Sequence, residues 1–156
     1  MPVRSTLGEE ARDQVAARLQ PLLVDLLDLS LTGKQLHWNV VGPNFKPLHE
    51  HLDELVASYR TWSDQVAERL ASIGVSPDGR VQRVAGDSPA DPAPESWIAD
   101  ADAVAVMASR VEAVARATRA RLDGLGDLDV ASEDLLIAIL DGLEMQLWML
   151  SAQEAR

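Results

Sequence analysis

The stretch LHEHLDELVASYRTWSDQVAERL, residues 48–70, decides the fold. Its apolar residues recur at steps of three and four, which places them along one face of a helix: Leu48, Leu52, Leu55, Tyr59, Trp62, Val66 and Leu70. Such a stripe has to be buried against other helices. The pattern therefore predicts an all-α protein. This helix should follow the Gly42-Pro43-Asn44 break, with Asn44 as its N-cap, and end near Ile73.

Three further helices are expected from the same periodicity. The first should run from about Glu9 to Val41, where Pro21 should bend it or mark the start of its stable part. The third is expected over about Glu95–Leu125, and the fourth should begin near 129–132. A proline-containing crossover over 75–94, with a short helix at about 80–85, joins the second helix to the third. This order predicts a ferritin-like four-helix bundle. The chain reads as one domain, 1–156, with residues 1–8 as a short N-terminal arm.

The composition limits the classes of function. The chain has 14 Lys and Arg against 25 Asp and Glu, which gives a formal net charge of -11. This charge disfavours binding to nucleic-acid phosphates and suits a protein that attracts cations. The absence of Cys excludes disulfides and thiolate metal sites. Residues 1–10 do not resemble a signal peptide, and the window 19–31, taken as the most apolar, is interrupted by charged residues. A cytoplasmic protein without a membrane span is expected.

Four polar side chains share one sector of the second helix, beside the apolar stripe. With His49 as the reference, Asp53, Asp64 and Glu68 fall within about 100° of it at ~100° per residue. Asp53 and Asp64 are separated by roughly 16 Å along the axis, at ~1.5 Å per residue. Metal–ligand bonds are only about 2 Å long. One copy of the helix therefore carries two separate half-sites.

The spacing of these residues suggests how the half-sites are completed. The pair His49 and Glu68 and the pair Asp53 and Asp64 are centred on the same point of the helix. Two antiparallel copies related by a two-fold axis at that point would bring His49 and Asp53 to the partner subunit's Glu68 and Asp64. One such contact builds two identical sites.

His37 adds a second imidazole to the half-site. It lies near the end of the first helix, and antiparallel packing of the first two helices would bring it level with His49. Imidazole and carboxylate ligands suit Fe(II), and also Zn(II), Mn(II) or Co(II). Two simpler readings stay open from spacing alone. The charged residues can form a solvated helix face, and His49 and Asp53 can be an ordinary i,i+4 pair.

The chain resembles the Dps family, the DNA-binding proteins from starved cells, over about residues 19–150. The resemblance is carried by residues 34–45 (KQLHWNVVGPNF), Leu48-His49, Asp53, Asp64, Ala67-Glu68-Arg69, residues 132–136 (SEDLL) and Trp148-Met149-Leu150. It implies a hollow homo-dodecamer built from two-fold dimers, with iron sites at the dimer interfaces. The family's iron ligands fall on the residues found from helical geometry: His37, His49, Asp53, Asp64 and Glu68.

The resemblance also implies an activity, namely oxidation of Fe(II) by hydrogen peroxide in preference to dioxygen, with Fe(III) mineral stored inside the shell. Such a ferroxidase would protect the cell from oxidative damage. Trp38 matches a family tryptophan near the site, where it could absorb a stray oxidising equivalent; the alternative is a core anchor. A cluster near the fourth helix resembles the family's acidic pore, with Asp127, Asp129 and Asp134 as candidates. Helix capping is the alternative for this cluster.

Two other functions are weighed against the ferroxidase. A DNA-compacting, nucleoid-associated protein is disfavoured, because only Arg4 precedes the first helix as a basic residue and no basic tail ends the chain. A di-iron oxidase acting on an organic substrate would need Glu-x-x-His pairs inside one bundle. The sequence has no such pair.

Overall fold

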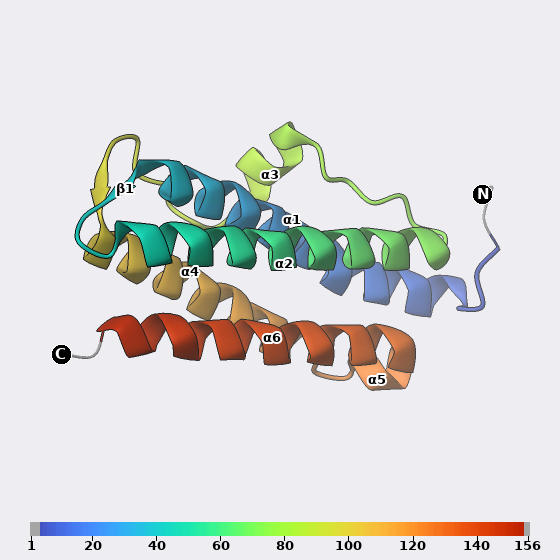
Figure 1. The fold of residues 1–156 in the computed structure, drawn as a ribbon. Helices are drawn as coiled ribbons and strands as arrows, with labels where there is room; N and C mark the ends of the chain where they lie inside the picture. Colours follow the sequence, from blue (N-terminus) through green and yellow to red (C-terminus); the bar gives the residue numbers. More distant parts are fainter. Residues whose placement is uncertain (1–3, 155–156) are drawn as a thin grey trace.

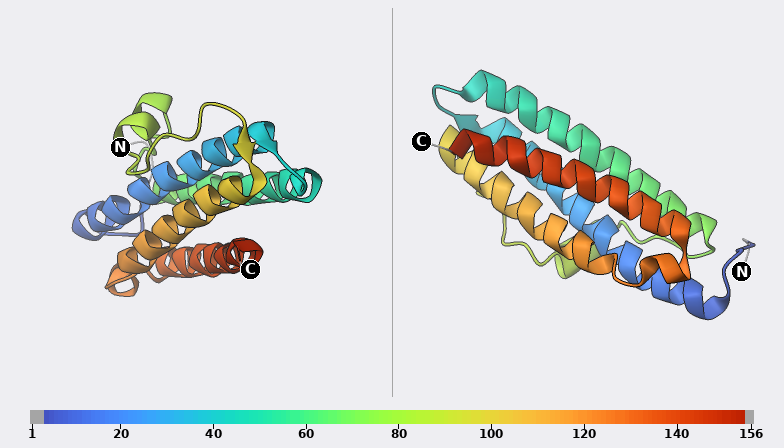
Figure 2. Two further views of the ribbon diagram at one scale, coloured as in Figure 1. Left: turned by 90° about the vertical axis from the view of Figure 1, so that its left-hand side faces the viewer. Right: turned by 90° about the horizontal axis from the view of Figure 1, so that it is seen from below.

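Four long helices form the body of the protein in the computed structural model, which describes residues 4–154 (Figure 1). They are α1 (Glu9–Asn39), α2 (Phe45–Ser72), α4 (Asp100–Arg121) and α6 (Val130–Glu154). The closest-packed pairs are α1 with α2 and α4 with α6, and α1 also contacts α4 (Figure 2). The predicted four-helix bundle with a long crossover is confirmed.

The crossover between α2 and α4 contains the expected short helix, α3 (Val81–Asp87), which packs on α1. It ends in a feature that the periodicity did not predict. Strand β2 (Ile98–Ala99) pairs in parallel with β1 (Val40–Val41), with Val40 opposite Ile98 and Val41 opposite Ala99. The predictions that the first helix continues to Val41 and that the third begins near residue 95 are therefore wrong. Residues 40–41 and 98–99, which were expected in these helices, form the small sheet instead.

The start of α2 is fixed by a contact with a residue outside this helix. Asn44 is the N-cap residue of α2, as predicted, but its side chain makes no capping bond. Its backbone N–H instead donates to the Asp100 carboxylate at 2.8 Å. Gly42 has a φ of 137°, and a Cβ atom there would lie within 3 Å of Asp100. The turn between α1 and α2 thus depends on glycine and on the first residue of α4.

Three smaller departures concern helix ends. Helix α1 begins at Glu9 and continues through Pro21, so the proline does not mark its start. Helix α4 ends at Arg121 rather than near Leu125. A short helix that was not predicted, α5 (Leu125–Leu128), follows Gly124, whose φ of 65° favours glycine.

The predicted apolar stripe of α2 lies in the core, where all of its members except the half-buried Trp62 are buried. Helix α6, and not the window 19–31, is long and apolar enough by composition to cross a membrane. In this structure α6 packs on α4 and places Leu136, Ile139 and Leu143 in the shared core. Helix α6 thus contributes one apolar face to the core of the bundle.

The two helices of the first pair approach each other closely at Gly33. A Cβ atom at this position would lie 2.6 Å from Cγ2 of Val56, closer than two carbon atoms can pack. Gly33 is buried, and it lies one turn before His37 on α1. The absence of a side chain at Gly33 therefore sets the spacing of α1 and α2 beside the predicted metal ligands.

Replacing Gly33 with Ala should destabilise the protein, because the added methyl group forces the helices apart. We expect a loss of about 1–3 kcal/mol in the free energy of unfolding, measured by urea denaturation. Gly86→Ala is the matched control, since Gly86 lies in α3 with no atom within 4 Å of the added carbon. Equal stability of the two variants would contradict the close-packing interpretation.

Candidate metal centre

His37 and His49 lie face to face between α1 and α2. Their ring centroids are 3.6 Å apart and the ring planes differ by 20°. His37 comes from the last turn of α1, where it is buried, and the half-buried His49 comes from the second turn of α2. Phe45 also contacts His49, with ring centroids 5.1 Å apart and ring planes tilted by 37°. The predicted meeting of the two histidines is therefore present within one chain.

Reciprocal hydrogen bonds fix both imidazoles. Nδ1 of His37 lies 2.8 Å from the carbonyl oxygen of His49, and Nδ1 of His49 lies 2.9 Å from the carbonyl oxygen of His37. A carbonyl oxygen only accepts, so each Nδ1 carries the hydrogen and donates it. In the neutral rings this leaves the lone pair on Nε2. Metal-binding histidines use this arrangement, in which the second nitrogen is held by a backbone carbonyl.

Asp53 lies one turn beyond His49 on α2, and Lys34 holds its carboxylate. The distance from Lys34 Nζ to Asp53 Oδ1 is 2.5 Å. This hydrogen bond is the main reason why the pKa of Asp53 is lowered, and charge on the two neighbouring histidines acts in the same direction. The carboxylate is therefore ionised and able to bind a cation at neutral pH. About half of the Asp53 side chain is exposed to solvent.

Asp64 and Glu68 occupy the other end of the exposed face of α2. Both side chains are exposed, and within residues 4–154 neither makes an ion pair. They cannot reach the two histidines, because α2 is one continuous helix and Asp64 follows Asp53 by three turns. The described part of one protomer brings no three His, Asp or Glu side chains together as a metal site. The five predicted ligands thus divide into the stacked His37 and His49, with Asp53 one turn further along α2, and the distant pair Asp64 and Glu68.

Trp38 lies next to this centre but outside the core. It follows His37 directly, and its side chain is 63% exposed. Lys34 Nζ lies 6.0 Å from its ring centroid. Within one protomer Trp38 is therefore not a core anchor, which was one of the two roles considered for it.

The three candidate pore residues differ in their surroundings. Asp127 and Asp134 are exposed at the junction of α5 and α6, whereas Asp129 is buried. Asp129 accepts hydrogen bonds from Nη2 of Arg69, at 2.5 Å, and from the hydroxyl and backbone N–H of Ser132. It binds the first turn of α6 to α2. This geometry favours the capping role for Asp129 and leaves Asp127 and Asp134 free to face solvent.

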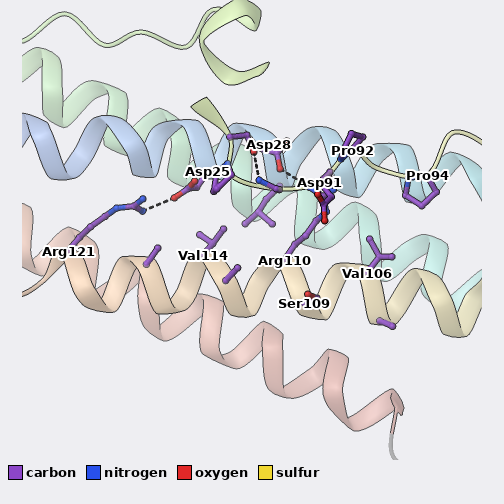
Figure 3. A pocket seen from close by; sticks show the side chains of 17 residues that line it. Asp25, Asp28, Asp91, Pro92, Pro94, Val106, Ser109, Arg110, Val114 and Arg121 are labelled. Carbon is purple, nitrogen blue, oxygen red and sulfur yellow. Dashed lines mark hydrogen bonds and ion pairs between the residues drawn. The ribbon is translucent and has the colours of Figure 1, made fainter. Parts of the chain in front are cut away.

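A cavity of about 640 Å³ lies elsewhere, between α1, α4 and the crossover (Figure 3). Two ion pairs line it: Asp25 with Arg121 at 2.7 Å and Asp28 with Arg110 at 2.9 Å. Burial raises the pKa of both aspartates, and the arginines partly oppose this shift. Asp25 and Asp28 are both paired with arginines, and no histidine lines the cavity, so it does not offer the cluster of free carboxylates and imidazoles that a divalent metal site needs.

Two contacts at these sites were not predicted. The Lys34–Asp53 pair depends on how α1 and α2 are aligned. The sequence did contain a signal for it, because the antiparallel packing that brings His37 level with His49 also brings Lys34 close to Asp53. The Arg69–Asp129 pair joins residues 60 positions apart, and no local pattern indicates it.

Comparisons with known proteins show which family the chain resembles in sequence and fold. The ferritin-like domain family matches residues 16–155. The chain is 37% identical over 150 residues to a DNA protection during starvation protein of Mycolicibacterium smegmatis, covering 94% of this chain and 80% of that one. A second protein of that description, from Agrobacterium fabrum, is 29% identical, covering 96% and 93%. The structure of Dps from Microbacterium arborescens in the high iron form superposes with a TM-score of 0.93 at 32% identity, covering 98% of this chain and all of that one.

The buried Asp129 should make stability depend on pH. Burial alone would raise its pKa, but the Ser132 hydroxyl and the Arg69 guanidinium outweigh this effect and lower it below the ordinary value of 3.8. The ionised carboxylate therefore stabilises the fold above that value, and its contribution is lost as the pH falls through the lowered pKa.

Asp129→Asn should accordingly lower the free energy of unfolding by roughly 1–3 kcal/mol at pH 7. The difference from the unmodified protein should shrink at pH 3, as measured by urea denaturation at both values. Asp102→Asn, at an exposed position of α4, serves as the control. A deficit for Asp129→Asn that is as large at pH 3 as at pH 7 would argue against the ion pair.

Proposed function

Because this chain belongs to the Dps family of ferritin-like proteins, we propose that it is a ferroxidase and iron-storage subunit. Two protomers pack their α2 helices antiparallel about a two-fold axis, and six such dimers form a hollow dodecamer. Each dimer interface contains two identical iron sites. In each site, which we call the interface site, His37, His49 and Asp53 come from one protomer, and the other ligands are the partner subunit's Asp64 and the partner subunit's Glu68.

The observation that carries this proposal is the reciprocal bonding of His37 and His49. A histidine that serves only to fill a core needs no such arrangement. Here two backbone carbonyls fix both tautomers, and the ionised Asp53 lies one turn beyond His49 on α2. Asp64 and Glu68 are exposed and make no ion pair within the described chain, so they are available to a second copy. Nitrogen and oxygen ligands of this kind suit Fe(II).

The proposed reaction is oxidation of ferrous ions by hydrogen peroxide, with dioxygen as a slower alternative. Reduction of peroxide to two water molecules takes two electrons and two protons, and each Fe(II) supplies one electron on becoming Fe(III). One ferrous ion acting alone would release hydroxyl radical. A site that delivers two electrons in close succession avoids this product, and Trp38, exposed beside His37, could absorb an unpaired oxidising equivalent.

The remaining features of the proposal follow from charge. Each chain carries a formal net charge of -11, so a dodecamer is strongly negative, attracts Fe(II) and repels DNA at neutral pH. Storage of Fe(III) mineral inside the shell, and not DNA compaction, is therefore the proposed role. A cytoplasmic location fits the family, with Asp127 and Asp134 proposed at the pores through which iron enters.

Loss of a ligand should remove fast iron oxidation. Protein loaded with Fe(II) without oxygen, then given one addition of peroxide, should show ferric absorbance with about two Fe(II) consumed per peroxide. His37→Ala and Asp53→Ala should each slow this phase by at least about tenfold, since the loss of even a supporting contact costs that much at metal sites. His51→Ala is the control, because His51 lies on the same helix but contacts Gln153 instead. Fast oxidation in all three variants would exclude the site.

Mixed assemblies test whether the site is shared. His37→Ala and Glu68→Ala subunits, co-assembled in equal amounts, should regain activity that neither possesses alone. Each mixed dimer has one interface site with both defects and one with none. With random pairing, roughly one quarter of all sites are intact, so the fast phase should return with about that amplitude. No recovery in verified mixed dimers would show that one protomer supplies all the ligands.

The pore proposal predicts that Fe(II) reaches the interface site more slowly, while the oxidation step itself is unchanged. Asp127→Asn combined with Asp134→Asn should slow iron uptake roughly tenfold at low ionic strength, because electrostatic guidance of the cation is lost. The difference should diminish at high salt. Asp102→Asn, which also removes an exposed carboxylate, should leave uptake unchanged. Stopped-flow absorbance measures the rates, and unaltered uptake in the double variant would remove these residues from the pathway.

A further inference from the structure

We propose that the cavity between α1, α4 and the crossover binds a small organic ammonium ion with an apolar body. The inference goes beyond the proposed function, because the cavity shares no residue with the interface site. Its volume of about 640 Å³ lies within the range of roughly 300–1,000 Å³ that is usual for small-molecule sites. Three of its lining residues on α4, Ala105, Ser109 and Ala113, are exposed, so a ligand can reach it from solvent.

The walls of the cavity are built from small and apolar side chains. On α4, small residues recur at every fourth position of the lining: Ala105, Ser109, Ala113 and Ala117. Residues four positions apart lie on one face of a helix, so these side chains form one shallow row. The crossover supplies a second wall with three prolines: Pro89, Pro92 and Pro94. A ligand therefore meets mainly apolar surface along the length of the cavity.

The two ends of the cavity differ in polarity. Figure 3 shows the pair of Asp25 and Arg121 at one end, and Val106 and Pro94 toward the other. Val106 precedes Arg121 by fifteen residues on α4, which corresponds to about 22 Å at ~1.5 Å per residue. A ligand that lies along α4 is therefore in contact with charged groups at one end and with apolar groups at the other. This arrangement suits an elongated molecule with one polar head.

The charge of the lining favours a positively charged head. Three carboxylates line the cavity, those of Asp25, Asp28 and Asp91, against the two guanidinium groups of Arg110 and Arg121. Within residues 4–154 the Asp91 carboxylate makes no ion pair, because Arg110 donates to the backbone carbonyl of Asp91 and pairs with Asp28. One negative charge in the lining therefore stays unbalanced. The net charge of -11 on the whole chain adds to the attraction for cations.

The two paired aspartates also have room for a further positive charge. The side chains of Asp25 and Asp28 are only 7% and 24% exposed. Burial has the largest effect on the pKa of each and raises it, while the arginines oppose the shift only in part. The charge on Asp28 raises the pKa of Asp25 further, because like charges one helical turn apart repel each other. An ammonium group near both would reduce this repulsion and donate hydrogen bonds to their oxygens. A carboxylate ligand would increase it.

Titration calorimetry of the assembled protein with four compounds at neutral pH tests this inference. Hexylamine combines an ammonium group with an apolar body. Hexanoate and hexanol keep the body but carry a carboxylate or a hydroxyl group, and methylamine keeps the charge without the body. Hexylamine should bind once per chain and at least about tenfold more tightly than each of the other three, because only hexylamine satisfies both ends of the cavity.

Two variants with matched controls show where hexylamine binds. Ala113→Leu places a larger side chain in the row of small residues and should abolish binding, whereas Ala120→Leu, at an exposed position of α4 outside the cavity, should not. Asp91→Asn removes the unpaired carboxylate and should weaken binding about two- to fivefold, as expected for an exposed charge. Asp102→Asn removes an equal charge from α4 outside the cavity and should leave the affinity unchanged.

Three results would overturn the inference. Hexanoate or hexanol that binds as tightly as hexylamine would show that the cavity does not select a cation. Hexylamine binding that survives Ala113→Leu would place the ligand elsewhere, and no saturable binding to the unmodified protein would exclude the site. His37→Ala should bind hexylamine normally while it loses fast iron oxidation, so the two proposals fail separately. Gel filtration and circular dichroism establish that each variant assembles and folds.

Discussion

The close antiparallel contact of α1 and α2 is the constraint on which the site depends. Gly33 lets the helices approach until Val56 fills the space where a side chain would be. At that spacing the rings of His37 and His49 stack, and each ring reaches the backbone carbonyl of the other residue. A wider separation would break both hydrogen bonds, and the tautomers would no longer be fixed. Helix packing therefore controls which imidazole nitrogen is available for chemistry.

The turn between these helices is secured by a distant part of the chain. Val40–Val41 pairs with Ile98–Ala99, and Asp100 accepts the N–H of Asn44. The end of the crossover thus fixes the turn between α1 and α2, and His37 and His49 lie on either side of this turn. This accounts for two short strands in a helical bundle. They add little area to the core, but they fix the register in which α1 meets α2, and an error of one residue there would separate the imidazoles.

The periodic parts of this structure could be predicted from the sequence, and the parts set by tertiary contacts could not. The stripe from Leu48 to Leu70 identified α2 within about one residue at each end, because burial of one face imposes a repeat. The strands at Val40 and Ile98 have two residues each, too few to show any period. Asn44 occupies the expected N-cap position, but its side chain makes no capping bond, and its backbone N–H donates to Asp100, 56 positions away.

The candidate site shows the same division. The two-fold spacing of His49, Asp53, Asp64 and Glu68 is a property of one continuous helix, so helical geometry alone could group them. Lys34 belongs to the family pattern, but its contact with Asp53 depends on how two helices face each other. Asp129 and Asp127 looked alike as acidic residues near a helix start. Only the packing of Arg69 against Asp129 separates a buried cap from an exposed carboxylate.

In the proposed function, the division of the ligands between two copies has a chemical consequence. In one protomer the imidazoles and Asp53 form an incomplete set, in which Lys34 neutralises the carboxylate. Three ligands bind a labile ferrous ion less firmly than five, so in the proposed scheme fast oxidation requires the dimer interface. In that scheme assembly precedes chemistry, and Fe(III) would form where the shell already encloses a space to receive it. An intrasubunit centre, as Glu-x-x-His pairs build in other bundles, would oxidise iron before any shell existed and would release insoluble product into solution.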